Sequence, residues 1–503
     1  MKTFKNLILA TLIITLSCKN DNDNEVVIPI NTSVNFSHKT TITVGGEGAS
    51  EITVFDKTTN KLFTVNVESN EISVHDISTL TAPKRESSID LSAYGAPNSV
   101  AVYNGKLAVA VEDAVKQNPG KVVVFNTIDN SIFNQYTVGA LPDMVKFSPD
   151  GKTIVSANEG EPSDDYTNDP DGSISIINLD NNNVTTLNFA SFNNQESTLE
   201  SKGFRVFGPN ADLAADVEPE YVAISEDSKT AWVSLQENNG IAKVNLTTKS
   251  IEAIYPLGFK DYSLANNSID ASDKDDVKEL KNWPVKGIYM PDAIVYTKIN
   301  GIEYIISANE GDARDYDGYS EEVRMDDLIL DEAVFSASND YLNKVNLGRL
   351  KTTTTLGDAN NDGKVEELYS FGARSFSIWS ANGNLVYDSG NDIASQTLSL
   401  TPDRFNDDDG RSDDKGAEPE SVEVLNINNQ RYILFVGLER NDQVLVYDIT
   451  NPIAPEFLQI LSHSGDEAPE GLFAISATDS PSGKALLVVS NEDSGTVTIY
   501  ENN

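Results

Sequence analysis

The stretch that decides the fold is PEYVAISEDSKTAWVSLQENNGIAKVNL, residues 219–246. It contains three short runs in which apolar and polar residues alternate, with polar turn residues between them. Alternation with a period of two is typical of β-strands that bury one face. The stretch therefore predicts three consecutive antiparallel strands joined by turns.

This pattern recurs along the chain, which indicates an internal repeat. The first run of each copy has a Pro or a small residue, then usually an acid or an amide, then an apolar strand. The second run usually ends in a polar cluster that contains Glu, as in TIVSANEG; a third resembles GKVVVFN, and a fourth, such as FLQIL, closes the unit. The seven copies begin at Ser50, Pro97, Pro142, Pro219, Pro291, Pro419 and Pro469.

Seven units of four strands predict an all-β fold, a seven-bladed β-propeller of four-stranded antiparallel blades over residues 36–503. The last unit supplies only three strands before the chain ends. Residues 36–51 read like a fourth strand that leads into a first strand. We therefore expect the N-terminal strand to close the last blade. The alternative, two stacked β-sandwiches, explains neither the number of units nor the unpaired strand.

Acidic residues follow the strands in a regular way, as in SANEGDARDYDGYSEE at residues 307–322. In an antiparallel meander, the end of the second strand lies beside the start of the first. We therefore expect the acids to gather on one face near the central channel, where cations or Arg must neutralise them. The first runs of the repeat supply Glu51, Asp143, Glu220, Asp292, Glu420 and Glu470. The second runs supply Glu112, Glu159, Glu237, Glu310, Glu439 and Glu492.

Long insertions open on the same face, because they follow a second strand or precede a first strand. They cover residues 161–171, 259–290, 312–366 and 403–417. We expect short helices within them at residues 275–281 and 331–347. Loops on a rigid scaffold commonly carry function, so this face is the candidate ligand face.

The formal net charge of −41 is spread along the 503 residues. A surface of this sign repels nucleic acid and anionic lipid headgroups, so we expect no nucleic-acid partner. Two interpretations fit the charge: solubility in a salty exterior, and a face that binds cations.

The N-terminus predicts secretion and lipid anchoring. Residues 1–18 combine two lysines, an apolar run and a small residue before Cys18, the only cysteine of the chain. This is the pattern of a signal peptide, which is too short to span a bilayer. With Cys18 at the cleavage point it resembles a bacterial lipobox, although Thr15 and Leu16 depart from that pattern. The acidic, Asn-rich residues 19–35 resemble the tethers of surface-exported lipoproteins.

We therefore expect acylated Cys18 to insert into outer-membrane lipid and to hold the protein at the cell surface, on the extracellular side. The alternative is a cleaved signal peptide without an anchor.

The most specific local motif is LGDANNDGKVEE, residues 356–367, which reproduces the start of a calcium-binding loop. Its predicted ligands are Asp358, Asn360 and Asp362. The twelfth position, where such loops carry Glu, holds Tyr369, and Glu366 or Glu367 could substitute. The alternative is a solvated acidic turn.

A second candidate for hard-cation binding is the run DDDGRSDD, residues 407–414, which a solvated loop would also explain. It lies just before Glu418 and Glu420 on the predicted acidic face. We predict calcium as the cofactor, with Glu159, Glu310 and Glu420 as further ligands.

Common catalytic sets are missing from the sequence. It holds no Cys nucleophile beyond the leader and no G-x-S-x-G, P-loop or H-E-x-x-H motif. His38, His75 and His463 fall on or beside strands of separate predicted blades, which argues against a zinc site. Hydrolysis would need calcium-like ions that polarise a phosphoryl oxygen, with a carboxylate as general base. The candidates for such chemistry are Glu310, Asp312, Arg314 and Arg411.

Several arginines lie within acidic surroundings. They are Arg314, Arg324, Arg374, Arg411 and Arg440. One interpretation is structural, in which the guanidinium groups pair with acids to hold the inserted loops. The other is that several of them converge with metal ions to hold an anion such as phosphate.

Three long phrases resemble a known family: SANEGDARDYDGYSEEVR (307–324), LYSFGARSFSIW (368–379) and RSDDKGAEPESVEV (411–424). They are similar to the choice-of-anchor I proteins, bacterial surface proteins related to the mesenchyme-specific cell-surface glycoproteins of biomineralising animals. The similarity runs from about residue 37 to the C-terminus. Some relatives are labelled alkaline phosphatase-like, so the resemblance implies a possible phosphomonoesterase without a settled catalytic constellation. Its motif positions are Asn309, Glu310, Asp312, Arg314, Asp315, Tyr316, Glu321, Glu322, Arg324, Arg374, Arg411, Asp413, Asp414, Glu418 and Glu420.

Two function classes follow. The first is a surface binding module with an acidic, calcium-binding face for an extracellular phosphoester, mineral, glycan or protein, and the lack of a defined nucleophile favours it. The second is a calcium-dependent phosphomonoesterase, which the resemblance and the clusters of Arg and acids favour.

Overall fold

The structure is a computed structural model, and it describes residues 32–503. Cys18 and most of the predicted leader and tether lie outside the described residues. The described chain forms seven four-stranded antiparallel sheets and a few short helices. The predicted all-β propeller is confirmed.

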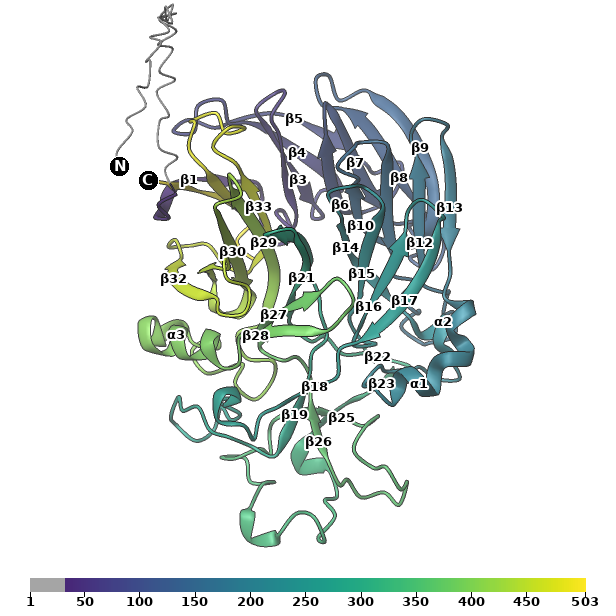
Figure 1. The fold of residues 1–503 in the computed structure, drawn as a ribbon, viewed down its shortest axis with the longest axis vertical. Helices are drawn as coiled ribbons and strands as arrows, with labels where there is room; N and C mark the ends of the chain where they lie inside the picture. Colours follow the sequence, from purple (N-terminus) through teal and green to yellow (C-terminus); the bar gives the residue numbers. More distant parts are fainter. Residues whose placement is uncertain (1–31) are drawn as a thin grey trace, which may run out of the picture. The chain divides into compact units, whose positions relative to one another are not determined.

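The first four sheets follow the order of the chain (Figure 1). Their strands are β2 Thr53–Asp56, β3 Lys61–Asn66, β4 Glu71–Asp76 and β5 Lys84–Asp90; β6 Pro97–Tyr103, β7 Lys106–Val111, β8 Pro119–Asn126 and β9 Ile132–Ala140; β10 Pro142–Phe147, β11 Thr153–Asn158, β12 Ser173–Asn178 and β13 Asn183–Leu187; and β14 Pro219–Ile224, β15 Thr230–Leu235, β16 Gly240–Asn245 and β17 Ser250–Pro256.

The other three sheets complete the ring. Their strands are β20 Ile294–Ile299, β21 Ile302–Asn309, β27 Ser375–Ser380 and β28 Leu385–Asp388; β29 Pro419–Ile427, β30 Arg431–Leu438, β31 Gln443–Asp448 and β32 Glu456–Leu461; and β33 Pro469–Ile475, β34 Leu486–Asn491, β35 Thr496–Asn502 and β1 Phe36–Thr43. The first strand of each sheet contacts the first strand of the next, and β33 contacts β2, so the ring is closed.

The N-terminal strand β1 completes the last sheet, as the sequence predicts. It pairs antiparallel with β35, from Phe36 opposite Asn502 to Thr43 opposite Thr496. Figure 1 shows β1, in purple, beside the yellow strands of the C-terminal end. Pairing of the two ends of the described chain removes the open edges that a linear series of sheets would leave.

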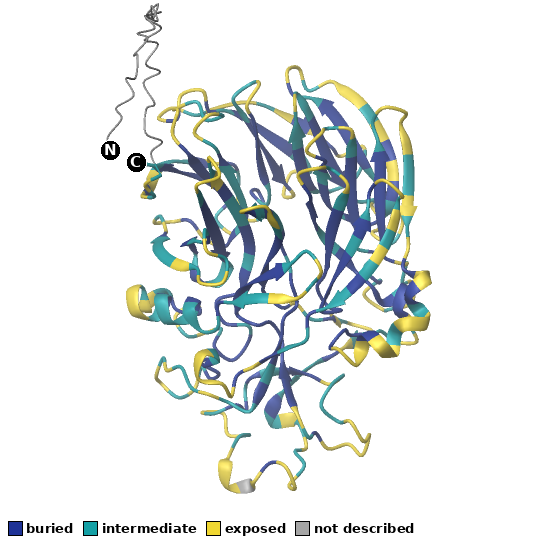
Figure 2. Cartoon of the chain, in the orientation of Figure 1, coloured by how far each residue is buried: buried dark blue, intermediate teal, exposed yellow. Residues whose placement is uncertain are grey.

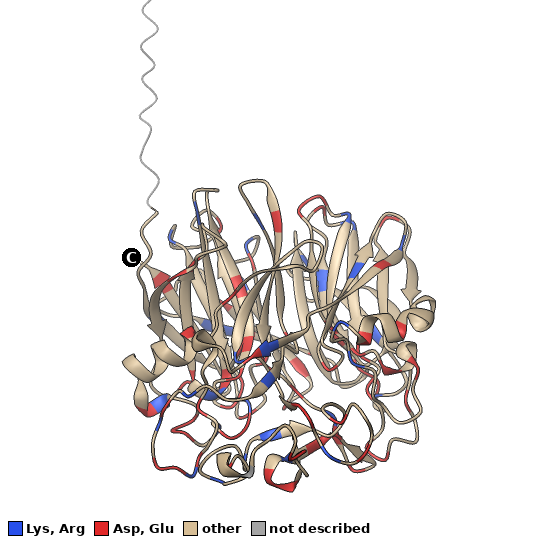
Figure 3. Cartoon of the chain, turned by 60° about the horizontal axis from the view of Figure 1, so that its bottom comes forward, with Lys and Arg blue, Asp and Glu red and all other residues tan. Residues whose placement is uncertain are grey.

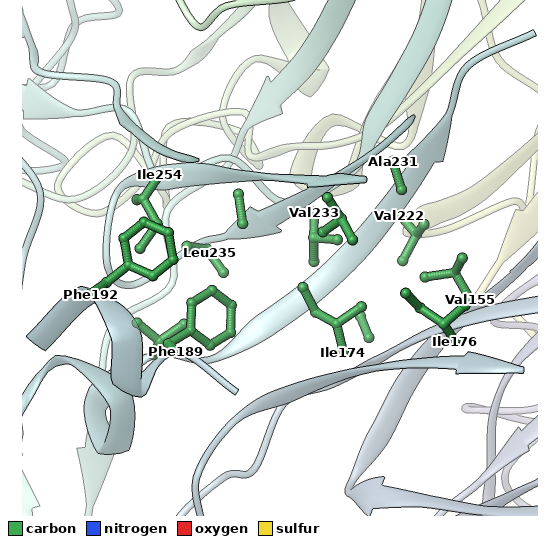
Figure 4. Close-up of a cluster of buried hydrophobic side chains, with 14 of the residues drawn as sticks. Val155, Ile174, Ile176, Phe189, Phe192, Val222, Ala231, Val233, Leu235 and Ile254 are labelled. Carbon is green, nitrogen blue, oxygen red and sulfur yellow. The ribbon is translucent and has the colours of Figure 1, made fainter. Parts of the chain in front are cut away.

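Apolar residues fill the spaces between neighbouring sheets. Between the third and fourth sheets, Ile174 and Ile176 of β12 pack with Val222 of β14 and Val233 of β15 (Figure 4). Strands near the ring's centre are almost wholly buried, whereas outer strands such as β9 and β13 carry several exposed residues (Figure 2).

The insertions form a lobe with its own core below the ring in Figure 1. Its strands are β18 Phe259–Asp261, β19 Val285–Ile288 and β26 Leu368–Ser370, the hairpin β22 Asp315–Tyr316 and β23 Tyr319–Ser320, and the pair β24 Glu322–Arg324 and β25 Lys351–Thr353. Tyr262, Met325, Leu347 and Leu350 are buried within this lobe. The lobe is therefore a packed element rather than a set of free loops.

Neither predicted helix of the insertions forms as expected. Residues 275–281 have no helix, and residues 331–347 contain only a short 3-10 turn. Asp275 and Asp331 each accept a hydrogen bond from the backbone N–H two residues on, at 3.3 and 2.6 Å. Such local bonds compete with helical ones.

Apart from that 3-10 turn, the helices lie elsewhere, including in an unpredicted insertion at residues 188–218. The α-helices are α1 Glu196–Glu200, α2 Leu213–Asp216 and α3 Asp392–Leu400, and the 3-10 helices are η1 Ala190–Gln195, η2 Ala265–Asn267, η3 Met325–Asp327, η4 Ala337–Asn339, η5 Pro402–Arg404 and η6 Glu439–Asn441. Within residues 32–503, none of them has the length and apolar character that a membrane-spanning helix needs.

We predict that Phe36→Ala lowers the free energy of unfolding by about 3 kcal/mol, because it leaves a cavity where β1 closes the ring. Phe36 is 3% exposed, and its ring lies edge-on to Phe435 with centroids 5.1 Å apart. Urea denaturation measures the change. Ile132→Ala, at a residue that is 53% exposed, is the control and should change stability by less than about 0.5 kcal/mol. Equal effects would contradict closure by β1.

Candidate functional site

The starts of the first strands and the ends of the second strands surround one cavity of about 380 Å³. Figure 3 shows acidic residues along the strand ends and the inserted loops beside them. The acids that line the cavity are Glu51, Asp143, Glu159, Glu161, Glu220, Glu237, Asp292, Glu310, Asp312, Glu420, Glu439 and Glu470. The cationic side chains that line it are Lys415 and Arg440.

Ten of these twelve acids are ones that the strand pattern assigned to this face. The other two, Glu161 and Asp312, come from the inserted loops. Glu112 and Glu492 do not line the cavity, but both interact electrostatically with Glu51, which does. The expected gathering of acids is therefore present in the structure.

A β-bulge directs the acid that follows Pro into the cavity. Pro142 pairs with Asn158 and Met144 with Ala157, so Asp143 has no partner of its own in the ladder. The same shift of register follows the first residues of β6, β14, β29 and β33. A bulge re-aims a side chain next to the paired strand, which explains why Pro followed by an acid recurs in the sequence.

The sequence SANEG occurs twice, at residues 156–160 and 307–311. Equivalent hydrogen bonds position the glutamate in both copies. Asn158 donates to Ser173 and Ser175 at 3.2 and 3.1 Å, and Asn309 donates to Ser375 and Ser377 at 3.2 and 2.8 Å. Each Asn thus ties the end of the second strand to the third strand. The glutamate that follows it lines the cavity in both copies.

A glycine then turns the chain away from the cavity. Gly311 has a φ of 93°, and a Cβ at this position would lie 2.2 Å from the backbone nitrogen of Gly372. Gly160 has a φ of 75° in the other copy. Only glycine combines this backbone conformation with so close an approach.

Crowding of carboxylates raises their pKa values. Burial, and secondarily neighbouring carboxylates, raise the pKa of Asp143, Glu237 and Glu310 to about 7. Burial followed by nearby carboxylates raises the pKa well above its usual range for Glu51, Glu159, Glu220, Asp292, Glu420 and Glu470. These acids cannot all ionise together unless a cation enters the cavity.

Two groups of three carboxylates in the cavity have the geometry of a cation site. One is Glu159, Glu220 and Glu237, and the other is Glu310, Glu420 and Glu439. In each group, one oxygen per residue lies within 4.8 Å of the others. Carboxylate oxygens are the ligands that calcium and similar hard cations prefer.

The predicted calcium loop is only partly assembled as expected. Asp362 and Glu366 form a third group with Asp331, which the parallel bridge between Leu330 and Val365 brings near. Asp358 instead accepts hydrogen bonds from the backbone of its own loop. Asn360 donates to Glu366. Sequence reasoning missed Asp331 because it lies outside the motif.

Four of the five candidate arginines do not line the cavity, and Arg440 is the one that does. Arg314 is 2% exposed, with Nη1 2.6 Å from Asp216 Oδ1 and Nε 3.1 Å from Glu218 Oε2. Arg324 pairs with Asp413 at 2.8 Å, and Arg374 donates to backbone carbonyls of the inserted loops. These placements favour the structural alternative over anion binding.

The other two arginines share the buried carboxylate of Glu418. Arg411 Nη2 lies 2.7 Å from Glu418 Oε1, and Arg440 Nε lies 3.2 Å from Glu418 Oε2. Glu418 is 0% exposed and also lies 3.7 Å from Lys415 Nζ. Lys415 in turn donates to Glu310 and lies 3.3 Å from Asp312. Glu418 therefore fixes the basic residues at the cavity's edge.

Sequence reasoning missed Lys415. The sequence signal that could have identified it is a lysine within the largely acidic phrase RSDDKGAE, residues 411–418.

The acidic run at residues 407–414 is largely neutralised by neighbouring basic residues. Asp413 pairs with Arg324 and Arg349, at 2.8 and 2.7 Å. Asp414 lies 3.1 Å from Arg411 and 3.2 Å from Lys351. No residue of this run belongs to any of the three carboxylate groups found among the described residues.

The three histidines lie on or beside strands of separate sheets, as expected, but two of them are in contact. His38 and His463 stack with ring centroids 3.9 Å apart. The reason is that β1 closes the last sheet beside the segment that follows β32. No histidine among residues 32–503 belongs to a group that could hold a metal ion.

Comparison with known proteins finds a match over most of the chain. Residues 51–452 match the family model of the choice-of-anchor I domain. Gigasin-3a of Magallana gigas is 31% identical over 183 residues, which cover 31% of this chain and 64% of Gigasin-3a. The matched part of the chain thus spans less than two thirds of the length of that relative.

Two solved structures resemble this chain at low sequence identity. Kuenenia stuttgartiensis hydrazine synthase has a TM-score of 0.51 and 13% identity, covering 93% of this chain and 99% of that chain. The Cps50 (Swd1) β-propeller domain of Myceliophteria thermophila has a TM-score of 0.47 and 8% identity, covering 93% and 100%. At such identities, the similarity to hydrazine synthase bears on the fold alone.

We predict that, in the presence of a chelator, the free energy of unfolding decreases as the pH rises from 6.5 to 8.5. Asp143, Glu237 and Glu310 have folded-state pKa values of about 7, raised mainly by burial, whereas unfolded carboxyls are already ionised. The folded state then holds more protons, and proton loss favours unfolding. Each group contributes about 0.8 kcal/mol over this range. Thermal unfolding at a series of pH values measures the effect.

Two histidines oppose this trend weakly, because burial lowers the pKa of His75 to about 4 and that of His38 below its usual value. Their unfolded imidazoles still release protons just above pH 6.5, which contributes at most about 0.4 kcal/mol each in the opposite direction. The matched control is Asp143→Asn, which should flatten the dependence. Stability that stays constant or rises over this range would contradict the raised pKa values.

Proposed function

The chain belongs to the choice-of-anchor I domain family, and we propose that it is a surface binding module whose acidic cavity holds a hard divalent cation such as calcium. One observation carries this proposal: twelve acids and only two cationic side chains line a single cavity. Cation binding would relieve the mutual repulsion of the buried carboxylates. A bound cation would also attract the oxygen-rich ligands that we propose as partners, namely a phosphoester, a mineral, a glycan or an acidic protein.

The placement of the basic residues favours binding over phosphomonoester hydrolysis. Arg411 and Arg440 both contact Glu418, and Arg314 contacts Asp216 and Glu218. A phosphate would have to displace these carboxylates to gain the guanidinium groups. We therefore rank a calcium-dependent phosphoesterase second.

We predict that calcium stabilises the protein against thermal unfolding, by about 2.7 kcal/mol at a concentration 100-fold above its dissociation constant. Asp143→Asn together with Glu220→Gln should remove most of this gain, because both side chains line the cavity. The matched control is Glu226→Gln with Glu252→Gln, which removes the same charge from exposed sites. Calorimetric titration of calcium into each protein gives the affinity.

Equal stabilisation of the two double variants would count against a cation in the cavity. Hydrolysis of a chromogenic phosphomonoester by the calcium-loaded protein, lost in the cavity variant alone, would reverse the ranking of the two functions.

We also propose that acylated Cys18 anchors the protein in the outer membrane with the propeller on the extracellular side. Support comes from the lipobox-like leader and from the family, since a choice-of-anchor domain suggests association with the cell surface. Cys18 itself lies outside the described residues.

We predict that Cys18→Ser abolishes incorporation of a labelled fatty acid and moves the protein from the membrane fraction to the soluble fraction. Protease treatment of intact cells should degrade the unmodified protein. Labelling that persists in Cys18→Ser would contradict the anchor.

A further inference from the structure

The two carboxylate groups of the cavity differ in how far the protein's own donors already satisfy them. This difference bears on the proposed cation site. It also separates the predicted ligands Glu159, Glu310 and Glu420, which sequence reasoning treated alike.

The group of Glu310, Glu420 and Glu439 already has cationic partners. The ammonium of Lys415 donates to Glu310 Oε1, and the side-chain amide of Gln236 donates to Glu310 Oε2 at 2.7 Å. Arg440 Nη2 lies 2.9 Å from Glu439 Oε1. Glu420 Oε2 has no hydrogen-bond partner within residues 32–503, but both of its neighbours in the group have one. A positive charge thus already sits against two of the three carboxylates.

Within residues 32–503, no ion pair joins a basic side chain to the carboxylates of Glu159, Glu220 or Glu237. Glu237 is 7% exposed, yet its Oε2 has no hydrogen-bond partner in the described part of the chain, and neither has Oε2 of Glu220. The guanidinium of Arg314 acts electrostatically on Glu237 but is held by Asp216 and Glu218. Arg205 donates to the backbone carbonyl of Glu237, at 2.9 Å, and not to its carboxylate. A buried carboxylate oxygen without a donor is costly unless a ligand supplies the missing contact.

We infer that the cation binds among Glu159, Glu220 and Glu237, and that Lys415 occupies the place of a second cation beside Glu310, Glu420 and Glu439. This inference rests on the proposed function and assigns the cation to one group. A divalent ion at the second group would lie close to the Lys415 ammonium, and repulsion between like charges in a buried site opposes its entry. Lys415 therefore limits the cavity to one ion.

Calcium titration in a calorimeter tests this assignment. All proteins carry Asp362→Asn, so that the exposed group at Asp331 does not contribute. Glu237→Gln and Glu310→Gln are a matched pair, because each removes one carboxylate from one group. We expect Glu237→Gln to weaken calcium binding at least tenfold and Glu310→Gln to change it by less than threefold. Glu310→Gln weakening it as much as Glu237→Gln would overturn the inference.

Lys415→Met provides an independent readout, because it removes the ammonium from the second group. We expect the number of bound calcium ions to rise from one to two, and to return to one when Glu237→Gln is added. A number that stays at one in folded Lys415→Met, as verified by circular dichroism, would overturn the role of Lys415. Failure of the parent protein to bind any calcium would instead overturn the proposed function itself, and the inference with it.

Discussion

Mutual repulsion between carboxylates in one buried cavity is the constraint on which the rest of the structure depends. The inner ends of the sheets and the inserted loops bring twelve acids together, and Lys415 and Arg440 supply only two opposing charges. Protons or a bound cation must make up the difference, which is why burial and crowding raise so many of the pKa values in this one place. Carboxylate oxygens are the ligands that hard cations prefer, which is why we propose cation binding for this cavity.

The surrounding structure holds the carboxylates in place at the cost of local irregularity. Bulges at the starts of five first strands turn side chains toward the cavity instead of into the ladder. The insertion at residues 403–417 contributes Lys415 and Arg411, and the buried Glu418 follows it directly. Contacts of Glu418 with Arg411 and Arg440 tie this insertion to the cavity's edge. Arg314, one of the motif's arginines, makes a similar connection to Asp216 and Glu218. The arginines in the phrases that resemble the family therefore have structural partners that support the site. No bound anion is needed to account for their positions.

Much of this architecture could be predicted from sequence, because its signals are local and repeated. A Pro followed by an acid marks a bulge, and SANEG marks the end of a second strand, so the face on which Glu220 or Glu310 lies follows from strand direction alone. Contacts between distant segments could not be predicted in this way. The sequence does not show that Lys415 reaches Glu310, that Asp331 joins Glu366, or that ring closure stacks His38 on His463. The helices expected at residues 275–281 and 331–347 do not form, because the side chains of Asp275 and Asp331 accept hydrogen bonds from nearby backbone amides.

The most direct test of the central claim is the position of the ion itself. Crystals grown with calcium and measured at a long wavelength would show the ion by its anomalous scattering. We expect a single peak in the cavity, at about 2.3–2.6 Å from carboxylate oxygens of Glu159, Glu220 and Glu237, with Lys415 still against Glu310. A peak among Glu310, Glu420 and Glu439 with Lys415 displaced, or no peak in the cavity at saturating calcium, would contradict the account.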